Sequence, residues 1–304
     1  MNINSDQKII DLPFSKNEFL DTAFRIQMNH PTGEVNYLEM EDVSMGEDGM
    51  SQLSLNVKRK AIETSTYQVH AENSKANSEN LKAFGINIDD QMSSILISEA
   101  NLNIQKLLKE KYLSLVVEVE KSTQSKWKTF LNKHFKLEFP EYFKDHIELV
   151  NKILMLSNLI AAKTRRGPAN FIIVSPKIAS IIAEDLRVVL ISDNSKTHTE
   201  PGVRPFANIA DKIKVFIDPT FKFDNETVII GRNTDDGNTG IVLGEYSRQL
   251  MKLDSVSAMD FTPSDKYQLR DRIAISQIGE RDLGYYTTKF VIGKKPFWRK
   301  IINA

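Results

Sequence analysis

Residues 53–71 read LSLNVKRKAIETSTYQVHA, and this stretch decides the architecture that the sequence predicts. Apolar and polar residues alternate over 53–58, which is the period of a strand with one covered face. A second β-rich segment, 63–68, follows the basic triplet 58–60. We predict that the two segments pair as a long hairpin with the triplet at its tip. Such a hairpin has too few apolar side chains to be stable alone, so it needs a partner surface.

The basic triplet consists of Lys58, Arg59 and Lys60. It can contact nucleic acid, remain a solvated tip, or pair with an acidic face of a neighbouring subunit. Taken alone, the triplet favours the solvated tip, because charged side chains are mostly exposed to water.

The segment before the hairpin, residues 1–50, is polar and irregular. Its apolar residues occur singly or in pairs, without a sustained helical or strand period. It still contains more aromatic residues, among them Phe14, Phe19 and Phe24, than a disordered segment usually does. We therefore expect an arm that becomes ordered by lying on another surface.

Two helices are predicted after the hairpin. Apolar residues recur at helical spacing from Asp89 to about Leu115. Asp89 is the expected N-cap of this long helix, and Asp90 places negative charge in its first turn, where the helix dipole favours it. The second helix is predicted over 141–163, after Pro140.

The pattern changes to an alternation of strands and helices after residue 165. The run FIIV at 171–174 is a short buried strand, and Ser175 then caps a helix whose first residue is Pro176. Further strands are predicted at residues 213–217, 227–230, 241–243, 272–278 and 287–292. The residues alone therefore indicate an α/β protein with an arm and a projecting hairpin.

Composition excludes several classes of protein. The 304 residues contain 40 Lys plus Arg and 40 Asp plus Glu, whereas a dedicated nucleic-acid-binding domain usually has a basic excess. The absence of cysteine excludes disulfides and thiolate metal sites. The longest apolar run, 153–162, is too short to cross a bilayer, and the first residues do not resemble a signal peptide. We expect a soluble protein made in the cytosol.

Motifs that indicate catalysis are missing. The five histidines are scattered, and no metalloprotease, phosphate-loop or nucleophile-elbow motif occurs. The segment 235–240 (DDGNTG) reads as a tight turn rather than a calcium loop, because it lacks alternating ligands and a later glutamate. We predict no catalytic residue, no metal and no cofactor. A cytosolic α/β enzyme remains a remote alternative.

A second basic cluster, Arg165, Arg166 and Gly167, follows the second predicted helix. It can contact phosphate or DNA. More often, such a cluster is the positive end of a helix followed by a glycine that stops it.

The order of these parts resembles that of the major capsid proteins of tailed bacteriophages, which share the Hong Kong 97 fold. Local segments are similar to the T-even coliphage major head protein family, in the same order, from about residue 45 to 292. They are the extended-loop segment 54–71, the start of the spine helix at 88–100 (IDDQMSSILISEA), the entry to the axial domain at 164–176 (TRRGPANFIIVSP) and the strand at 214–219 (KVFIDP).

The resemblance implies an α+β fold of the Hong Kong 97 type in five parts. They are an N-terminal arm (1–50), an extended β-hairpin loop (51–82), a peripheral domain with the spine helix (83–164), an α/β axial domain (165–264) and strands that return to the peripheral domain before the C-terminus (265–304).

The resemblance also implies a structural function. Identical copies would form pentamers and hexamers of an icosahedral shell around double-stranded DNA, in a virion assembled in the host bacterial cytoplasm. Vertex, scaffold, portal and decoration proteins are further expected partners, with non-specific contact to packaged DNA and no membrane. We hypothesise that the triplet pairs with carboxylates of a neighbouring copy, for which the candidates are Asp89, Asp90 and Glu99. A pentameric vertex paralogue and an encapsulin-like shell protein remain alternatives.

Overall fold

The computed structural model describes most of the chain in twelve segments. They are residues 8–15, 17–40, 44–45, 51–52, 55–114, 146–164, 167–191, 202–221, 227–233, 240–256, 263–277 and 287–291. The predicted turn at 235–240, most of which is not described, and the first residues of the predicted second helix therefore lie outside these ranges.

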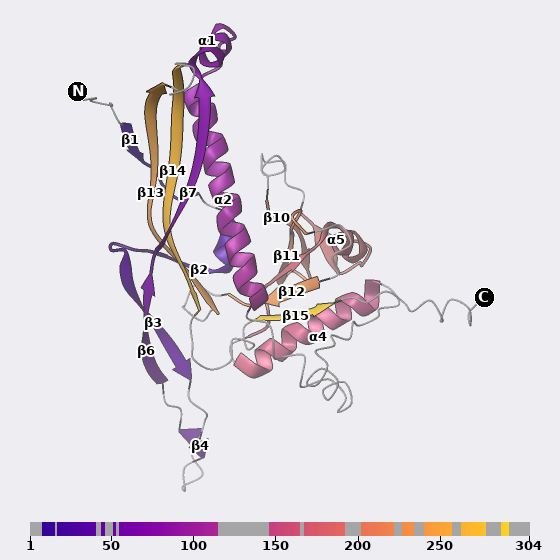
Figure 1. Cartoon of the computed structure of the whole chain (residues 1–304). Coiled ribbons are helices and arrows are strands. Elements are labelled where there is room, and N and C mark those ends of the chain that lie inside the picture. Colours follow the sequence, from indigo (N-terminus) through magenta and orange to yellow (C-terminus); the bar gives the residue numbers. More distant parts are fainter. Residues whose placement is uncertain are drawn as a thin grey trace, which may run out of the picture.

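A sheet of long strands forms one half of the molecule (Figure 1). β13 (Ile241–Val256) and β14 (Pro263–Gln277) run antiparallel over almost their whole length. β7 (Ser65–Ser74) pairs with the free side of β14. β1 (Lys8–Asp11) and β2 (Phe24–Gln27) both pair with β13, at different points along it.

The predicted hairpin within residues 53–71 is wrong in its pairing. β6 (Leu55–Glu63) does not pair with β7 but with β3 (Thr32–Met40), while β7 pairs with β14. The alternation at 53–71 does correspond to extended strands, but the chain does not reverse direction there. β6 and β7 follow each other almost without a break, and the pairing partner changes at Thr64. Strand period shows that a segment is extended, not which strand it pairs with. We call the two-stranded sheet of β3 and β6 the ribbon. Figure 1 shows it extending away from the rest of the molecule.

The short strands β4 (Ser44–Met45) and β5 (Ser51–Gln52) pair with each other farther along the ribbon. Lys58, Arg59 and Lys60 therefore lie within β6, not at the turn as predicted.

The expectation that residues 1–50 order on another surface is wrong for the part that includes β1 and β2. Phe19 and Leu20, at the start of the short helix η1 (Leu20–Thr22), are 0% and 2% exposed and pack in the core of their own chain. Tyr112 donates a hydrogen bond from its hydroxyl to the carbonyl of Thr22 (2.8 Å). Of the scattered aromatic residues of this segment, Phe19 is a core residue, and Phe14 and Phe24 are partly buried and pack against core clusters of the same subunit.

The predicted long helix is α2 (Ile88–Ser114), which follows the shorter α1 (Lys75–Ala83). The predicted N-cap is wrong by two residues. The side chain of Asn87 accepts from the backbone N–H of Asp89 (3.2 Å), and Asp89 and Asp90 lie in the first turn. Asn and Asp are nearly equivalent as caps, so sequence does not choose between them.

α2 connects the two halves of the molecule. Leu96 and Ala100, near its middle, pack against the long sheet, and Ile104 and Leu108, one to two turns later, pack against the second sheet. The second sheet has the strand order β15-β12-β8-β11-β10-β9. Its strands are β8 (Phe171–Val174), β9 (Val188–Leu190), β10 (Arg204–Ile209), β11 (Ile213–Ile217), β12 (Thr227–Gly231) and β15 (Thr287–Val291).

The second sheet is covered on both faces. Ile172 and Val174 of β8 face the helices α4 (His146–Thr164) and α5 (Pro176–Ile182), whereas Phe171 and Ile173 face α2 and η1. This explains why FIIV is apolar throughout, as a strand buried on both faces must be. The predicted cap of α5 is confirmed, since the Ser175 hydroxyl accepts from the N–H of Ile178 (3.5 Å) and Pro176 follows at the first helical position.

Replacing Gly231 with alanine should destabilise this sheet by about 1–3 kcal/mol, the usual cost of overpacking a core. Gly231 lies opposite Phe171, and a Cβ at this position would overlap the Phe171 ring, which is 3% exposed and cannot move away. Denaturant unfolding would measure the loss. Adding Phe171→Leu should recover part of it. If the effects of the two substitutions on the free energy of unfolding are simply additive, the proposed clash is wrong.

Candidate assembly surface

The base of the ribbon is fixed to the long sheet. Val35 and Ile62 are 5% and 4% exposed and pack with Met28, Val242 and Ala274. Lys60 donates from Nζ to the carbonyl oxygen of Gln277 at the end of β14 (2.5 Å). The direction in which the ribbon leaves the subunit is therefore set by packing.

At the next residue pair the ribbon is open to solvent. The neighbouring pair Asn36 and Arg59 is exposed on both strands, and the Arg59 side chain is 73% exposed. Arg59 lies 3.8 Å from Glu34, a pair on the surface that contributes at most about 1 kcal/mol. Lys58 lies opposite Tyr37 in the ladder. Of the predicted triplet, Lys60 has a partner in its own chain and Arg59 remains available for another.

Asp89, the first predicted carboxylate, is used within its own chain. It accepts hydrogen bonds from Nζ of Lys252 (2.7 Å) and from the hydroxyl of Tyr267 (2.6 Å). These two bonds lower the pKa of Asp89 below its ordinary value. Burial, together with the bond to Asp89, raises the pKa of Tyr267 to about 12. Asp89 therefore ties the first turn of α2 to β13 and β14.

The other two carboxylates differ in exposure. Asp90 is exposed and accepts from the side-chain amide of Asn87 (2.7 Å), and Glu99 is half-buried. Asp90 lies at one end of a groove along α2. Short polar side chains dominate the lining, which comprises Ser15, Asn17, Asp90, Ser93, Ser94, Ile97, Ser98 and Asn101.

The subunit does not bring the triplet and these carboxylates together. Figure 1 shows the ribbon and the N-terminal end of α2 at opposite ends of the molecule. A contact between the two sets of charges would therefore have to join different copies of the chain. The pairing of Lys58, Arg59 and Lys60 with Asp89, Asp90 and Glu99 stays a prediction.

The second basic cluster is described only at its last residue. Arg165 and Arg166 lie outside the described residues. Gly167 has a φ of +120°, a conformation that favours glycine, and a Cβ there would lie 2.7 Å from the guanidinium of Arg232. Arg232 in turn donates to the carbonyl of Pro168 (2.7 Å). This position is consistent with a glycine after a helix end.

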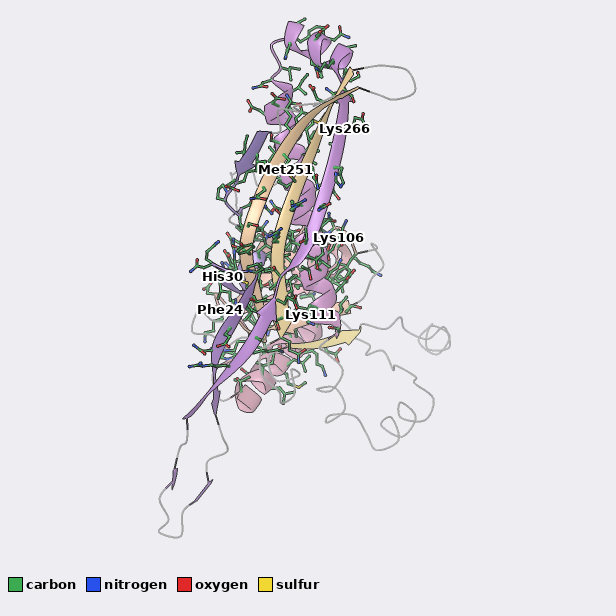
Figure 2. The ribbon with its side chains drawn as sticks, turned by 60° about the vertical axis from the view of Figure 1, so that its left-hand side comes forward. Phe24, His30, Lys106, Lys111, Met251 and Lys266 are labelled. Atoms are coloured by element: carbon green, nitrogen blue, oxygen red, sulfur yellow. The ribbon has the colours of Figure 1, made fainter. Side chains whose placement is uncertain are left out.

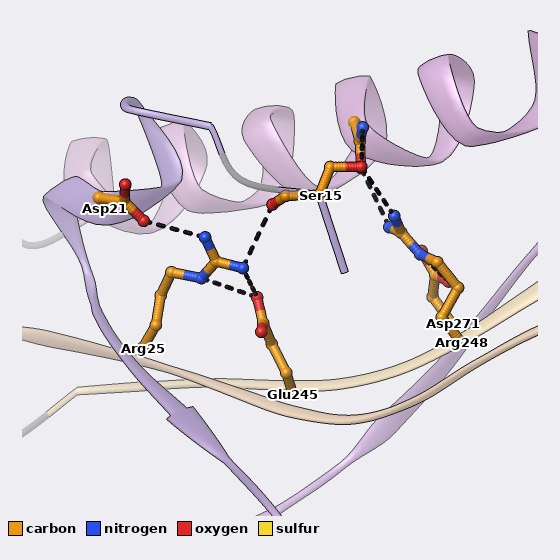
Figure 3. A network of polar contacts seen from close by, with 7 residues as sticks. Ser15, Asp21, Arg25, Glu245, Arg248 and Asp271 are labelled. Carbon is orange, nitrogen blue, oxygen red and sulfur yellow. Dashed lines mark hydrogen bonds and ion pairs between the residues drawn. The ribbon is translucent and has the colours of Figure 1, made fainter. Parts of the chain in front are cut away.

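Sequence reasoning missed a partly buried polar network between the N-terminal segment and β13 (Figure 3). Arg25 binds both Asp21 (2.9 Å) and Glu245 (2.8 Å). Burial of Glu245 raises the pKa of its carboxyl group, although the Arg25 charge opposes this. Arg248, which is 2% exposed, donates from Nε and Nη2 to Asp271 (both 2.8 Å). The one sign of this network in the sequence was Arg248, a charged residue at a strand position whose side chain points inward.

Sequence reasoning also missed an apolar surface beside α5. Leu186 is fully exposed, and Val189 and Leu190 of β9 are more than half exposed. The strand is only three residues long and is the last strand of the second sheet.

The described residues provide no cluster of His, Asp and Glu that could hold a metal ion. Among the described helices, none is both long and apolar enough to span a membrane.

Comparison with known proteins assigns the chain to a family. The family model described as "Major capsid protein Gp23" matches residues 6–275. No curated protein sequence matches. Similar solved structures come from Microbacterium phage Oxtober96 (TM-score 0.54, 12% identity, 96% of this chain and 95% of that chain) and Mycobacterium phage Bobi (0.54, 9%, 93% of each chain). A third is the capsid structure of cyanophage P-SCSP1u (0.51, 6%, 95% of this chain and 91% of that chain). At these identities the likeness concerns the fold, and it confirms the predicted Hong Kong 97 type.

Proposed function

The chain belongs to the family of major capsid protein Gp23, and from this premise we propose how its copies join. The chain is a structural capsid protein of a tailed phage and not an enzyme, and its copies assemble into the shell of the virion. We propose that the copies form pentamers and hexamers of an icosahedral head. Within them, the ribbon of one copy lies along α2 of the next.

The observation that carries this proposal is the exposure of the ribbon. Its base has an apolar core, but the next residue pair, Asn36 and Arg59, has none and is open to water. Isolated two-stranded hairpins are marginally stable in water, so a long ribbon requires a second surface. In a shell, that surface is another copy of the same chain.

The groove along α2 fits the role of this second surface. The side chains of Ser94 and Ser98 can donate to and accept from an extended backbone, and Asp90 supplies the charge opposite to Arg59. Figure 1 shows the ribbon and the N-terminal end of α2, which carries Asp90, at opposite ends of one subunit, and this suits a head-to-tail contact that closes into a ring. Asp90 is the preferred partner for Arg59, because Asp89 already binds Lys252 and Tyr267.

Negative-stain electron microscopy of the purified chain tests the assembly itself. Shells, tubes or capsomer rings are the expected particles. A protein that stays monomeric at every concentration and salt condition tried would contradict the proposal. Copy number in virions would separate a main shell subunit from the pentameric vertex alternative.

Removing the basic charges of Lys58 and Arg59 should weaken particles without unfolding the subunit. The variant Lys58→Ala/Arg59→Ala should dissociate at lower denaturant or temperature than the wild type, while monomer unfolding stays within about 0.5 kcal/mol, as is usual for surface changes. Each pair contributes only about 1 kcal/mol, so the effect depends on repetition over many copies. The variant Lys106→Ala/Lys212→Ala removes the same charge from exposed sites elsewhere. Equal particle stability in the two variants would refute the pairing.

The other components of the virion are also part of the proposal. We expect scaffold, portal, vertex and decoration proteins, non-specific contact with packaged double-stranded DNA, and assembly in the host cytoplasm. Neutral net charge supports close packing of many copies, because strongly charged subunits would repel each other at shell density. Mass spectrometry and nuclease protection of purified particles would identify these components.

A further inference from the structure

The two edges of the long sheet differ. β13 forms one side, and there the chain covers it with two of its own segments, β1 and β2. β7 forms the other side, and no described strand pairs with its outer edge. Figure 2 shows the three long strands side by side in front of α2, with β7 at the side of the sheet.

Of the usual protections of an edge strand, β7 lacks shortness, a bulge and proline. Proteins protect edges by keeping them short, by bulges or by proline, since exposed backbone N–H and C=O groups recruit other strands. β9, the last strand of the second sheet, has three residues. β7 has ten, contains neither proline nor glycine, and pairs with β14 in an unbroken register.

The side chains of β7 are also incompletely covered. Tyr67, Val69 and Ala71 point to the α2 side and pack against core clusters, but they remain half-buried. His70 and Glu72 lie on the other face and are exposed. A strand beyond β7 would cover the first set and pair with the second.

We propose that β7 of one copy pairs antiparallel with β7 of a second copy across a two-fold axis, so that two subunits share one continuous sheet. The inference rests on the proposed shell function, which supplies second copies at high local concentration and, in an icosahedral shell, two-fold axes between capsomers. It concerns a different surface from the ribbon and its groove, and it joins subunits of different capsomers.

A second copy suits this edge because the edge is self-complementary. A two-fold pairing centred on Val69 places His70 opposite Gln68, and one centred on Ala71 places His70 opposite Glu72. Neither register places like charges opposite each other. Such an isologous contact also satisfies the outward backbone groups of both strands at once.

Cysteine cross-linking tests the proposal directly, because the chain contains no cysteine. Single variants Gln68→Cys, Val69→Cys, His70→Cys and Ala71→Cys would be assembled, oxidised and separated without reductant. We expect cross-linked dimers and no larger species. One of the four positions should cross-link at least tenfold more efficiently than Thr66→Cys, because only the residue at the centre of a two-fold strand pair lies next to the same residue of the other copy. Exposed Asn158→Cys on α4 is the control that should stay monomeric.

Each result has a separate meaning. If the cysteine-free chain forms no particles, the proposed function fails. If particles form and no β7 position cross-links, or all positions cross-link equally, the β7 contact is wrong while the shell function stands. If His70→Cys cross-links only when Asn36→Cys is added, the occupant is a ribbon and the proposal is overturned.

Charge substitutions give an independent test. In the register centred on Val69, Gln68→Lys/His70→Lys and Gln68→Glu/His70→Glu each place like charges across the shared edge and should each reduce closed shells at least tenfold. Mixing the two variants should restore them, since each lysine then faces a glutamate. Where cross-linking places the centre at Val69, normal shells from either variant alone would overturn the proposal.

Discussion

Arg248→Met should lower the free energy of unfolding by about 3–5 kcal/mol, the usual cost of removing one partner of a buried ion pair. The Arg248 side chain is 0% exposed and binds both oxygens of Asp271, whose side chain is 3% exposed. It also donates to the Asn101 side chain (3.0 Å) and lies 4.7 Å from the centre of the Phe14 ring. Methionine would leave the Asp271 carboxylate buried without its charge partner.

Arg248, on β13, contacts three other parts of the subunit. Arg248 is on β13, Asp271 on β14 and Asn101 on α2, and Phe14 belongs to the N-terminal segment. We therefore expect a loss of cooperativity as well as of stability, measured by denaturant unfolding followed with two probes.

Two controls separate burial from charge. Arg59→Ala removes an arginine from an exposed pair and should cost less than about 1 kcal/mol. The double variant Arg248→Met/Asp271→Leu removes both charges and should recover part of the loss. If Arg248→Met behaves like Arg59→Ala, the buried pair does not hold the sheet together as we infer.

Shortening the ribbon should abolish closed shells while leaving the subunit folded. Replacing residues 37–58 with Asn-Gly joins Asn36 to Arg59 through a two-residue turn, which suits two directly opposite strand residues. Val35 and Ile62 keep their core contacts, so the free energy of unfolding should change by less than about 1 kcal/mol, as for changes outside a core. Electron microscopy would show no closed particles.

Deleting residues 1–45 is not an equivalent experiment. That deletion removes Phe19, Leu20 and Val35 from the core and should unfold the subunit itself. A useful control for the ribbon variant replaces only residues 46–50 with glycine and serine, which keeps the length of the loop. Closed shells formed by the shortened variant at wild-type yield would rule out the ribbon as an assembly element.

Local elements were predictable wherever one short-range rule dominates. FIIV at 171–174 and the Ser175-Pro176 cap depend on residues within one turn of each other, and both are confirmed. The strands at 213–217 and 227–230 are confirmed for the same reason. The long helix was also predicted, although its cap lies at Asn87.

Pairing was not predictable from the same residues. The β3–β6 ladder joins strands separated by a loop, and the β7–β14 ladder joins residues 65–74 to residues 264–273. Strand period is the same whichever partner a strand takes, so the hairpin prediction failed. The burial of Phe19 could not be predicted for a related reason. A single aromatic residue without a periodic pattern does not show whether another part of the chain will cover it.

The amino-acid sequence by itself determined the long helix, the strands at 171–174, 213–217 and 227–230, and the helix that begins at Pro176. Those features follow from local periodicity and capping, whereas the capsid architecture was expected from the resemblance to a known family. Only the tertiary structure decided that Lys60 binds Gln277 of its own chain while Arg59 lies in a surface pair with Glu34, that Asp89 binds Lys252 and Tyr267, and that no described strand pairs with the outer edge of β7. Each of these depends on contacts between residues far apart in the chain, and such contacts form only when the whole core packs.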